Sequence, residues 1–269
     1  MTELIEIIKY IILGIIQGIT EIFPISSSGH LTLFSHLFNM DMSHFPTFLM
    51  ITNMGSFLAL LYFFRRDVGQ LIKGTFCYLI RKDETGKEDF LYVLKLIIAV
   101  IPVGIVGFLI KDYLPNDLLS VGFALVITSA LLYYVYKQKD IQWKNDITWR
   151  NALIVGAFQM FAIFPGISRS GITISGGLTQ KIELKKVLRF SFLSYLVISV
   201  PVSLLGIYEA FKGNETINYI GYASAFVMSF VFSLIAVRFL YNYVKVKNLI
   251  YFSIYCLVVG LVCIVLYIV

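Results

Sequence analysis

Six uninterrupted apolar segments, each long enough to cross a lipid bilayer, constrain the fold of this chain more than any other feature. The hydrocarbon core of a bilayer is about 30 Å thick, so an α-helix needs about 20 residues to span it. The segments are residues 45–64, 90–110, 118–136, 188–208, 217–240 and 249–269. They predict an all-α polytopic membrane protein with six spans. The composition agrees, because 58% of residues are hydrophobic and only 14% are charged.

Two further hydrophobic runs are broken by a Phe-Pro pair and a Ser-Gly cluster, within residues 14–31 and 156–177. After each break only a short apolar arm remains before polar residues return, and such an arm is too short to cross. Irregular backbone is tolerated at membrane depth where protein buries it or where it lines a polar cavity. We therefore expect two re-entrant helical hairpins, over residues 10–38 and 150–180.

The positive charges predict the orientation of the spans. Of the 22 Lys and Arg residues, 18 lie in four stretches, residues 65–95, 137–150, 181–189 and 238–247. The positive-inside rule makes these stretches cytoplasmic. The spans then alternate consistently only if the second hairpin enters and leaves on the inner side, the first does so on the outer side, and both termini lie outside. The net charge of +6 thus reports orientation, and we expect no nucleic acid partner.

The two halves of the chain share a pattern of letters. Five residues of the first broken run recur 142 positions later: Gly14, Gln17, Ser26, Ser28 and Gly29 match Gly156, Gln159, Ser168, Ser170 and Gly171. Chance similarity among small and apolar residues is the alternative interpretation. Together with the opposed orientations, the matches predict an inverted repeat in a single membrane domain. Residues 1–136 and 150–269 would each contribute one hairpin and three spans.

Each break also carries one residue that is charged at neutral pH, Glu21 in the first and Arg169 in the second. Ionisable groups at bilayer depth are costly and are therefore functional hypotheses by default. The second arm of each hairpin would direct free backbone N–H groups and a positive dipole end toward a shared centre. Arg169 adds a planar fork that matches two phosphate oxygens. The pattern predicts an anion site.

Hydroxyl groups surround these two charges and supply further donors for phosphate oxygens. The candidates are Ser26, Ser27, Ser28, Ser168, Ser170 and Thr173. Their alternative role is to cap the second arms of the hairpins. Gln17 lies one helical turn before Glu21 on the same face, and its amide could orient a phosphate or a water.

Glu21 and His30 are the candidates for proton transfer. The Glu21 carboxylate could ligate a hard cation such as Mg²⁺ or act as a general base. The alternative is a buried ion pair between Glu21 and Arg169. A helix N-terminus favours a neutral imidazole, so His30 could accept a proton or attack phosphorus, although a lone histidine is more often structural.

The two motifs GxxQGxTExxPxSSSGH (residues 14–30) and PGxSRSGxTxSGG (residues 165–177) resemble those of the undecaprenyl-pyrophosphate phosphatase family, the bacitracin-resistance membrane proteins of bacteria. The resemblance implies removal of the terminal phosphate from undecaprenyl pyrophosphate, which recycles the carrier lipid of cell-wall biogenesis. It further implies a plasma-membrane protein whose active site faces outward, and it is compatible with a homodimer.

Carried over by residue, the family's Glu/Gln-x-x-x-Glu motif falls on Gln17 and Glu21, its Ser-His element on Ser27 and His30, and its arginine on Arg169. The resemblance implies a divalent cation, Mg²⁺ or Ca²⁺, held by Glu21. The attacking group would be the serine, the histidine or an activated water.

Two departures from the family pattern bear on this assignment. Gln17 leaves a single carboxylate in the motif, and Asn53-Met54-Gly55 stands where Gln-Leu-Gly is usual. Metal demand or activity could therefore differ. The competing function is a polyprenyl-phosphate transporter or flippase, because inverted hairpins suit alternating access. Release of phosphate distinguishes the two.

Overall fold

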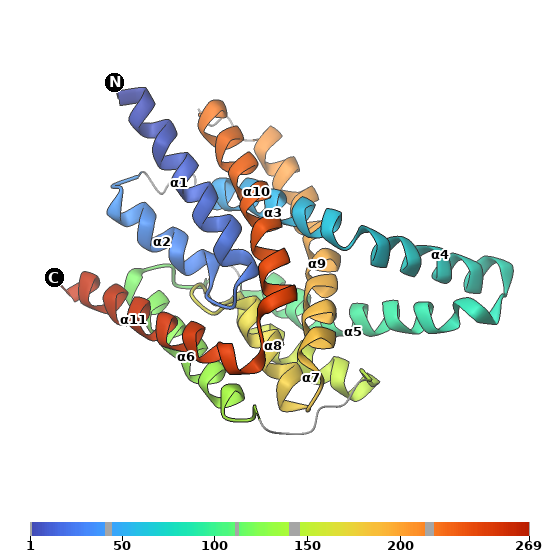
Figure 1. Ribbon diagram of the computed structural model, residues 1–269. Helices are drawn as coiled ribbons and strands as arrows, with labels where there is room; N and C mark the ends of the chain where they lie inside the picture. The colour runs from blue at the N-terminus through green and yellow to red at the C-terminus, as the bar shows by residue number, and fades with distance from the viewer. Residues whose placement is uncertain (1, 41–44, 111–112, 140–145, 213–217, 269) are drawn as a thin grey trace.

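The computed structural model describes residues 2–40, 45–110, 113–139, 146–212 and 218–268, without the side chains of residues 2–3 and 205–212. Within these ranges the chain forms helices and no β-strand (Figure 1). Six helices are long and apolar enough to cross a membrane. The predicted all-α polytopic class is confirmed.

The six long helices correspond to the six predicted spans. They are α3 (Phe45–Phe63), α5 (Lys87–Ile110), α6 (Leu118–Tyr136), α9 (Leu184–Lys212), α10 (Tyr219–Tyr243) and α11 (Leu249–Ile268). Helix α9 extends four residues beyond the predicted span at each end. The prediction counted apolar residues only, whereas the helical hydrogen bonds of the backbone continue into the flanking polar residues. The predicted boundaries at residues 217 and 269 lie outside the described residues.

Each of the two broken runs forms a helical hairpin. The first consists of α1 (Thr2–Ile22) and α2 (Ser27–Leu37). The second consists of α7 (Trp149–Met160), a short 3₁₀ turn η3 (Phe161–Ile163) and α8 (Arg169–Thr179). Helix α1 begins eight residues before the predicted start of the hairpin, so the first arm is nearly twice as long as that of the second hairpin. The tips of the two hairpins meet inside the molecule.

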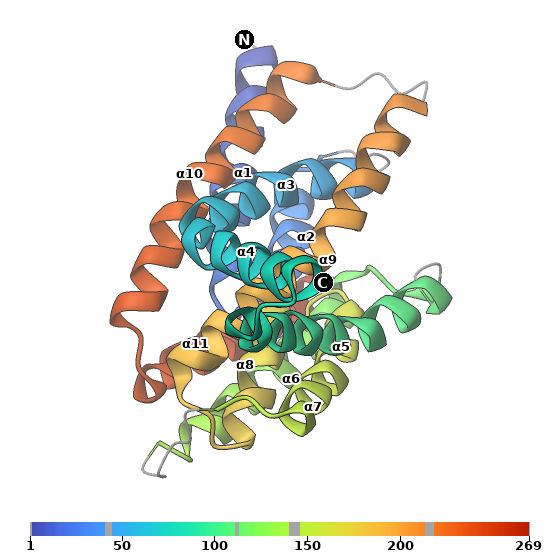
Figure 2. The same ribbon diagram turned by 90° about the vertical axis from the view of Figure 1, so that its right-hand side faces the viewer.

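A helical arm projects from the body. It is built from α4 (Arg65–Arg81), a 3₁₀ turn η1 (Glu84–Gly86) and the start of α5, as Figures 1 and 2 show. The two helices of the arm pack closely because small residues face each other, with Gly86 lying against the backbone of Gly74. Tyr78 and Phe90 stack across the arm with their ring centroids 5.1 Å apart.

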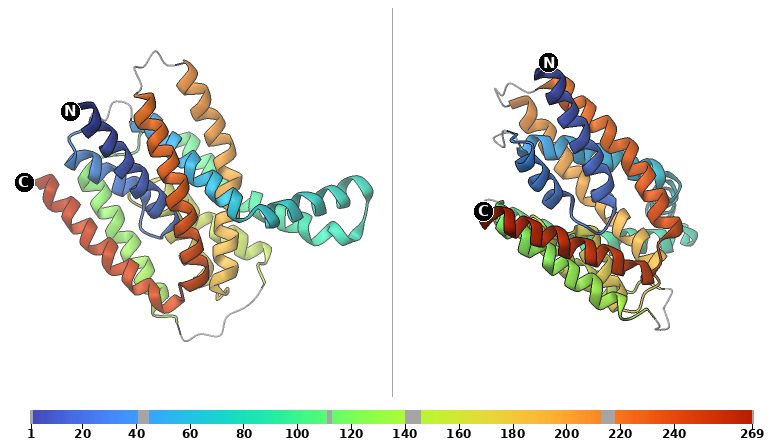
Figure 3. Two further views of the ribbon diagram at one scale, coloured as in Figure 1. Left: turned by 45° about the horizontal axis from the view of Figure 1, so that its top comes forward. Right: turned by 60° about the vertical axis from the view of Figure 1, so that its left-hand side comes forward.

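Helices from the two halves pair in a reciprocal pattern. Helix α1 runs parallel to α10 and crosses it where Gly14 lies against the backbone of Ala225. In the other half α7 crosses α5 in the same way, with Gly156 against Ala99. Helices α6 and α11 lie side by side (Figure 3) and run antiparallel, since Gly122 lies against Gly260 whereas Ser129, further along α6, bonds to Ser253, which comes earlier in α11. An inverted repeat would produce such exchanged partners, and the repeat itself stays a prediction.

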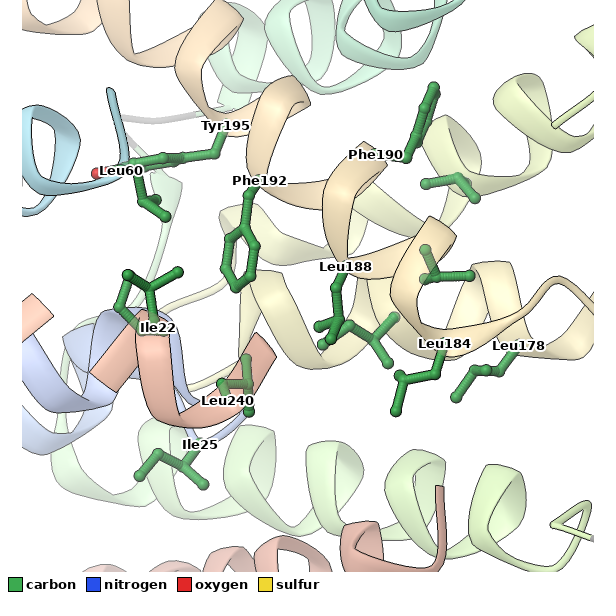
Figure 4. Close-up of a cluster of buried hydrophobic side chains, with 14 of the residues drawn as sticks. Ile22, Ile25, Leu60, Leu178, Leu184, Leu188, Phe190, Phe192, Tyr195 and Leu240 are labelled. Atoms are coloured by element: carbon green, nitrogen blue, oxygen red, sulfur yellow. The ribbon is translucent and has the colours of Figure 1, made fainter. Parts of the chain in front are cut away.

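The largest buried cluster lies around the first half of α9 (Figure 4). Side chains of α9 such as Leu188 and Phe192 face residues of the first hairpin, α3 and α10, including Ile22, Leu60 and Leu240. Helix α11 joins α10 through a 3₁₀ turn, η4 (Val246–Asn248). Because α9 is packed on several sides, it is a rigid wall for the space between the hairpin tips.

Candidate active site

Each hairpin tip ends at a serine that caps the second arm. The Ser26 hydroxyl accepts a hydrogen bond from the Gly29 N–H at 3.3 Å. The Ser168 hydroxyl does the same for Gly171 at 3.1 Å. Capping satisfies one of the free N–H groups at the start of a helix. The alternative role considered for these two serines, helix capping, is therefore present in the structure.

The two tips are bonded to each other. The Ser170 hydroxyl donates to the Phe23 carbonyl at 3.0 Å, and the Gly166 N–H donates to the Ser28 hydroxyl at 3.3 Å. Glycines let the tips approach closely, since a Cβ atom on Gly29 would lie 3.2 Å from the Cα of Gly166. Serines predicted to bind substrate are thus also structural ties between the halves.

A cavity of about 200 Å³ lies between the tips, with α3 and α9 forming its other walls. Polar side chains from both hairpins line it: Thr20, Glu21, Ser26, Ser27, Ser28, Ser168, Arg169 and Ser170. Helices α3 and α9 add Met50, Asn53, Tyr195, Ile198, Ser199, Val202 and Ser203. The first turns of α2 and α8, whose dipoles favour an anion, therefore border the same cavity.

Three side chains donate hydrogen bonds to the Glu21 carboxylate, and this residue is only 9% exposed. Its Oε1 accepts from the Nη2 of Arg169, which forms the ion pair between the halves. Its Oε2 accepts from the Ser27 hydroxyl at 2.5 Å and from Gln17 Nε2 at 3.1 Å. A serine hydroxyl bonded to a carboxylate is the arrangement of a nucleophile and its base.

Arg169 is held flat in the cavity and keeps one donor free. The carbon at the centre of its guanidinium lies 3.6 Å from the ring centroid of Tyr195, which is a cation–π contact. Its Nη1 is buried and has no hydrogen-bond partner among the described residues. A buried unpaired donor is costly, so this atom is suited to an anionic ligand.

Gln17 lies behind Glu21 and outside the cavity lining. Its Nε2 donates to Glu21 and, at 2.6 Å, to the side-chain oxygen of Asn53, whereas its Oε1 has no partner among the described residues. The residue is fully buried. Gln17 thus fixes the orientation of the carboxylate, as a residue one helical turn away can.

His30 and Thr173 do not line the cavity. The Nδ1 of His30 lies 2.7 Å from the Ser26 carbonyl, which can only accept, so Nε2 accepts from the Tyr255 hydroxyl at 2.8 Å. The ring also stacks on Tyr255 of α11. Thr173 bonds to the Arg169 carbonyl and to Ser191. Both residues support the tips from behind, and their roles in catalysis and binding stay predictions.

Sequence reasoning did not select Tyr195 or Ser199, and it noted Asn53 only as a departure from a family pattern. Tyr195 and Asn53 are linked, because the Tyr195 hydroxyl donates to the Asn53 carbonyl at 3.2 Å. Polar residues inside apolar spans are a usable signal. Here, however, serines and threonines occur in most spans, so the signal does not separate cavity residues from those that tie helices together.

The cavity offers oxygen donors to a cation. Among the described residues no three His, Cys, Asp or Glu side chains cluster, and Glu21 is the carboxylate of the cavity. Asn53, which also lines the cavity, carries a side-chain oxygen, whereas the Oε1 of Gln17 is buried outside the lining. Mg²⁺ commonly uses one or two carboxylates together with substrate phosphates. This donor set fits such a cation.

Comparison with known proteins agrees with the motifs. The family model described as bacitracin resistance protein BacA matches residues 10–262. An undecaprenyl-diphosphatase of Acholeplasma laidlawii is 57% identical over 277 aligned positions, covering the whole of both chains. Undecaprenyl-diphosphatase 2 of Bacillus thuringiensis is 38% identical over 97% of each chain. The chain therefore belongs to the BacA family of bacitracin resistance proteins.

Proposed function

We propose that this protein is a membrane phosphatase that hydrolyses undecaprenyl pyrophosphate to undecaprenyl phosphate and inorganic phosphate. One observation carries the proposal: Glu21, Ser27 and Arg169, drawn from two hairpins, meet in one cavity of a multi-pass membrane protein. The names of its relatives support the same reaction. Recycling of this carrier lipid would serve cell-wall biogenesis and confer resistance to bacitracin.

Arg169 binds the diphosphate in this proposal. Its buried Nη1 has no hydrogen-bond partner among the described residues, and a phosphate oxygen can replace the Glu21 oxygen at Nη2. The planar fork then holds two oxygens of the ligand. The N–H groups at the start of α2 and α8 add to the positive potential. Because these groups are fixed before the substrate arrives, they stabilise the charge that spreads in the transition state.

Ser27 is the nucleophile that the geometry favours over His30. Its hydroxyl oxygen attacks the terminal phosphorus in line, and its proton passes to Oε2 of Glu21. The bond from that phosphorus to the bridging oxygen breaks, and undecaprenyl phosphate leaves with the electron pair. Glu21 gives that proton to the departing phosphate oxygen. Water then attacks the phosphoserine while Glu21 accepts a proton from it, the bond from phosphorus to the Ser27 oxygen breaks, and Ser27 takes this proton as inorganic phosphate is released.

A divalent cation, Mg²⁺ or Ca²⁺, completes the proposal. Glu21 and Asn53, which line the cavity, would hold it, and Gln17 would orient the Glu21 carboxylate. When bound, the cation supplies charge neutralisation for the diphosphate oxygens. The residues of the chain still position the substrate and move the proton.

The site is proposed to face outward from the bacterial plasma membrane. Helix α1 is parallel to α10, and α11 is antiparallel to α6, so both chain ends lie on the side where α6 and α10 begin. The positive-inside rule makes that side external. The substrate is a lipid of the same bilayer, and no nucleic acid or second copy of the chain is required.

Release of phosphate from farnesyl diphosphate by the purified protein tests the proposal. We expect Glu21→Gln and Arg169→Ala each to lower turnover by about 10³-fold or more, and EDTA to lower it reversibly. The matched control is the ion pair of Asp67 and Arg189, which are 2.7 Å apart and outside the cavity. Asp67→Asn should stay within a few-fold of wild type.

Two results would contradict the phosphatase. One is wild-type turnover in Glu21→Gln. The other is movement of polyprenyl phosphate across reconstituted vesicles by a protein that releases no phosphate, which would favour the transporter instead. Each variant is first checked for normal elution in detergent, so that loss of fold is not read as loss of chemistry.

A further inference from the structure

Two apolar grooves of nearly equal size open on the surface of the molecule. The first, of about 500 Å³, lies between α6 and the second hairpin, and we call it the α6 groove; its walls include Phe123, Ala124, Ile127, Phe158, Phe164 and Ile167. The second, of about 520 Å³, lies between α4, α5 and α9 and is called the α4 groove; Ile72, Phe76 and Val197 line it. In a membrane, acyl chains can fill both.

Of the two grooves, only the α6 groove adjoins the cavity that contains Glu21 and Arg169. Ile167, at the tip of the second hairpin, lines both the groove and the cavity. The α4 groove shares no lining residue with the cavity. The tip segment next to Ile167 is fixed from both sides, since Gly166 bonds to Ser28 and lies against Val121 and Ala124 of α6. The cavity and the α6 groove are therefore two sides of one rigid tip.

We propose that the α6 groove receives the first isoprenyl units of the substrate, so that the prenyl chain passes over Ile167 and along α6 while the diphosphate occupies the cavity. The proposal rests on the proposed function and adds the place of the chain. When the diphosphate occupies the cavity between the hairpin tips, α3 and α9, its lipid chain needs a lateral path toward the bilayer. The groove provides one whose lining is almost entirely apolar.

The groove acts on positioning more than on affinity. Lipid chains are as apolar as the groove, so moving the prenyl chain between them gains little hydrophobic free energy. A fitted channel instead restricts the direction from which the terminal phosphorus approaches Ser27. Misplacement of a reacting group by about 1 Å can cost about 10²-fold in rate.

A matched pair of substitutions separates this groove from a general lipid surface. Ile127 is half exposed in the α6 groove, and Ile72 is 66% exposed in the α4 groove. Ile127→Trp and Ile72→Trp add the same side chain to the two grooves. With farnesyl diphosphate, Ile127→Trp should lower kcat/KM by roughly tenfold or more through a misplaced diphosphate, whereas Ile72→Trp should match wild type. With methyl diphosphate, which has no prenyl chain, both variants should match wild type.

The outcomes distinguish this inference from the phosphatase itself. Equal kcat/KM of the two variants with farnesyl diphosphate, in an active wild type, would overturn the groove and leave the phosphatase standing. Equal loss on both substrates in Ile127→Trp would also overturn it, because the effect would not depend on the chain. A wild type that hydrolyses neither substrate would remove the proposed function and the inference with it.

Photolabelling gives a readout that does not depend on turnover. A farnesyl diphosphate analogue with a diazirine in its first isoprenyl units should label α6 near Ile127, and excess unlabelled farnesyl diphosphate should suppress the labelling. Labelling spread evenly over α6 and α4, or insensitive to the competitor, would mean that the groove holds bulk lipid and would overturn the proposal.

Discussion

The two hairpin tips have nearly the same backbone plan but carry different chemistry. In both, a serine caps the second arm and a second serine ties the tip to the opposite one. At the positions between these serines, however, Ser27 in the first tip corresponds to Arg169 in the second, 142 residues later. Glu21 likewise corresponds to Ile163. A repeated scaffold thus brings two tips together, and their unlike residues supply a carboxylate, a hydroxyl and a guanidinium to one cavity.

The largest expected effect concerns those unlike residues. If Ser27 is the nucleophile, Ser27→Ala should lower kcat by about 10³-fold or more. Arg169→Lys, which keeps the charge but loses the planar fork, should retain part of the activity. The measurement is phosphate release together with acid-quenched protein labelled from a terminally ³²P-labelled diphosphate. Label on the Ser27 peptide supports the assignment, and an active, unlabelled Ser27→Ala protein would transfer the attack to water.

The second prediction compares the two helix crossings that hold the first arms of the hairpins, α1 on α10 and α7 on α5. A Cβ atom on Gly14 would lie 2.4 Å from the Ala225 carbonyl oxygen, and one on Gly156 would lie 2.8 Å from that of Ala99. Both contacts are with backbone, so the helices must separate. We expect Gly14→Ala and Gly156→Ala to destabilise the fold by about 1–3 kcal/mol or more, with the larger effect at Gly14.

Thermal unfolding in detergent measures these changes. The control is Gly69→Ala, since no atom lies within 4 Å of a Cβ atom at Gly69 of α4. That change should be neutral or stabilise the helix by up to about 1 kcal/mol. A Gly156→Ala protein that loses more stability than Gly14→Ala would mean that the second crossing is the tighter one.

The third prediction concerns the bonds between the tips. Ser28→Ala leaves the Gly166 N–H without its acceptor, whereas Ser170→Ala removes one of two donors to the Phe23 carbonyl, which also accepts from the Ile25 N–H. Ser28→Ala should cost about 1–2 kcal/mol, because it leaves a backbone N–H unpaired, and Ser170→Ala should cost about 1 kcal/mol or less, because the Phe23 carbonyl keeps its bond from Ile25. The double variant should cost less than the sum, since the two bonds hold the same pair of tips. Additive losses would show that the tips move independently.

The sequence predicted the two hairpin tips better than it predicted the residues that other helices add to the cavity. Letters at a fixed offset located both tips, and the embedded charges indicated that Glu21 and Arg169 share a site, as they do. The partners contributed by other helices were not accessible in this way. Asn53 and Tyr195 reach the cavity because α3 and α9 cross there, and no local period in either helix encodes that crossing.

His30 shows that the sequence can locate a residue near the site without predicting where its side chain points. Its position three residues after Ser27 suggested a place in the site, yet its bond to the Ser26 carbonyl turns the ring toward Tyr255 of α11. The partner lies 225 residues away in the sequence. Spacing alone therefore gave the neighbourhood of this side chain, whereas the direction of the ring depends on tertiary packing.

The smallest effect tests a difference between the two capping serines. Ser26 has φ 70°, in the left-handed region, whereas Ser168 has φ −70°. Replacing a cap serine by glycine costs a few tenths of a kcal/mol, but a non-glycine residue in the left-handed region costs about 1–2 kcal/mol. Ser26→Gly should therefore leave stability unchanged or raise it by up to about 1 kcal/mol. Ser168→Gly, which relieves no strain and adds freedom to the unfolded chain, should lower it by about 1 kcal/mol. Unfolding temperatures of the two variants that shift in opposite directions support the comparison. A fall of equal size in both would mean that the turn at Ser26 is unstrained and that the two tips differ only in the charges they carry.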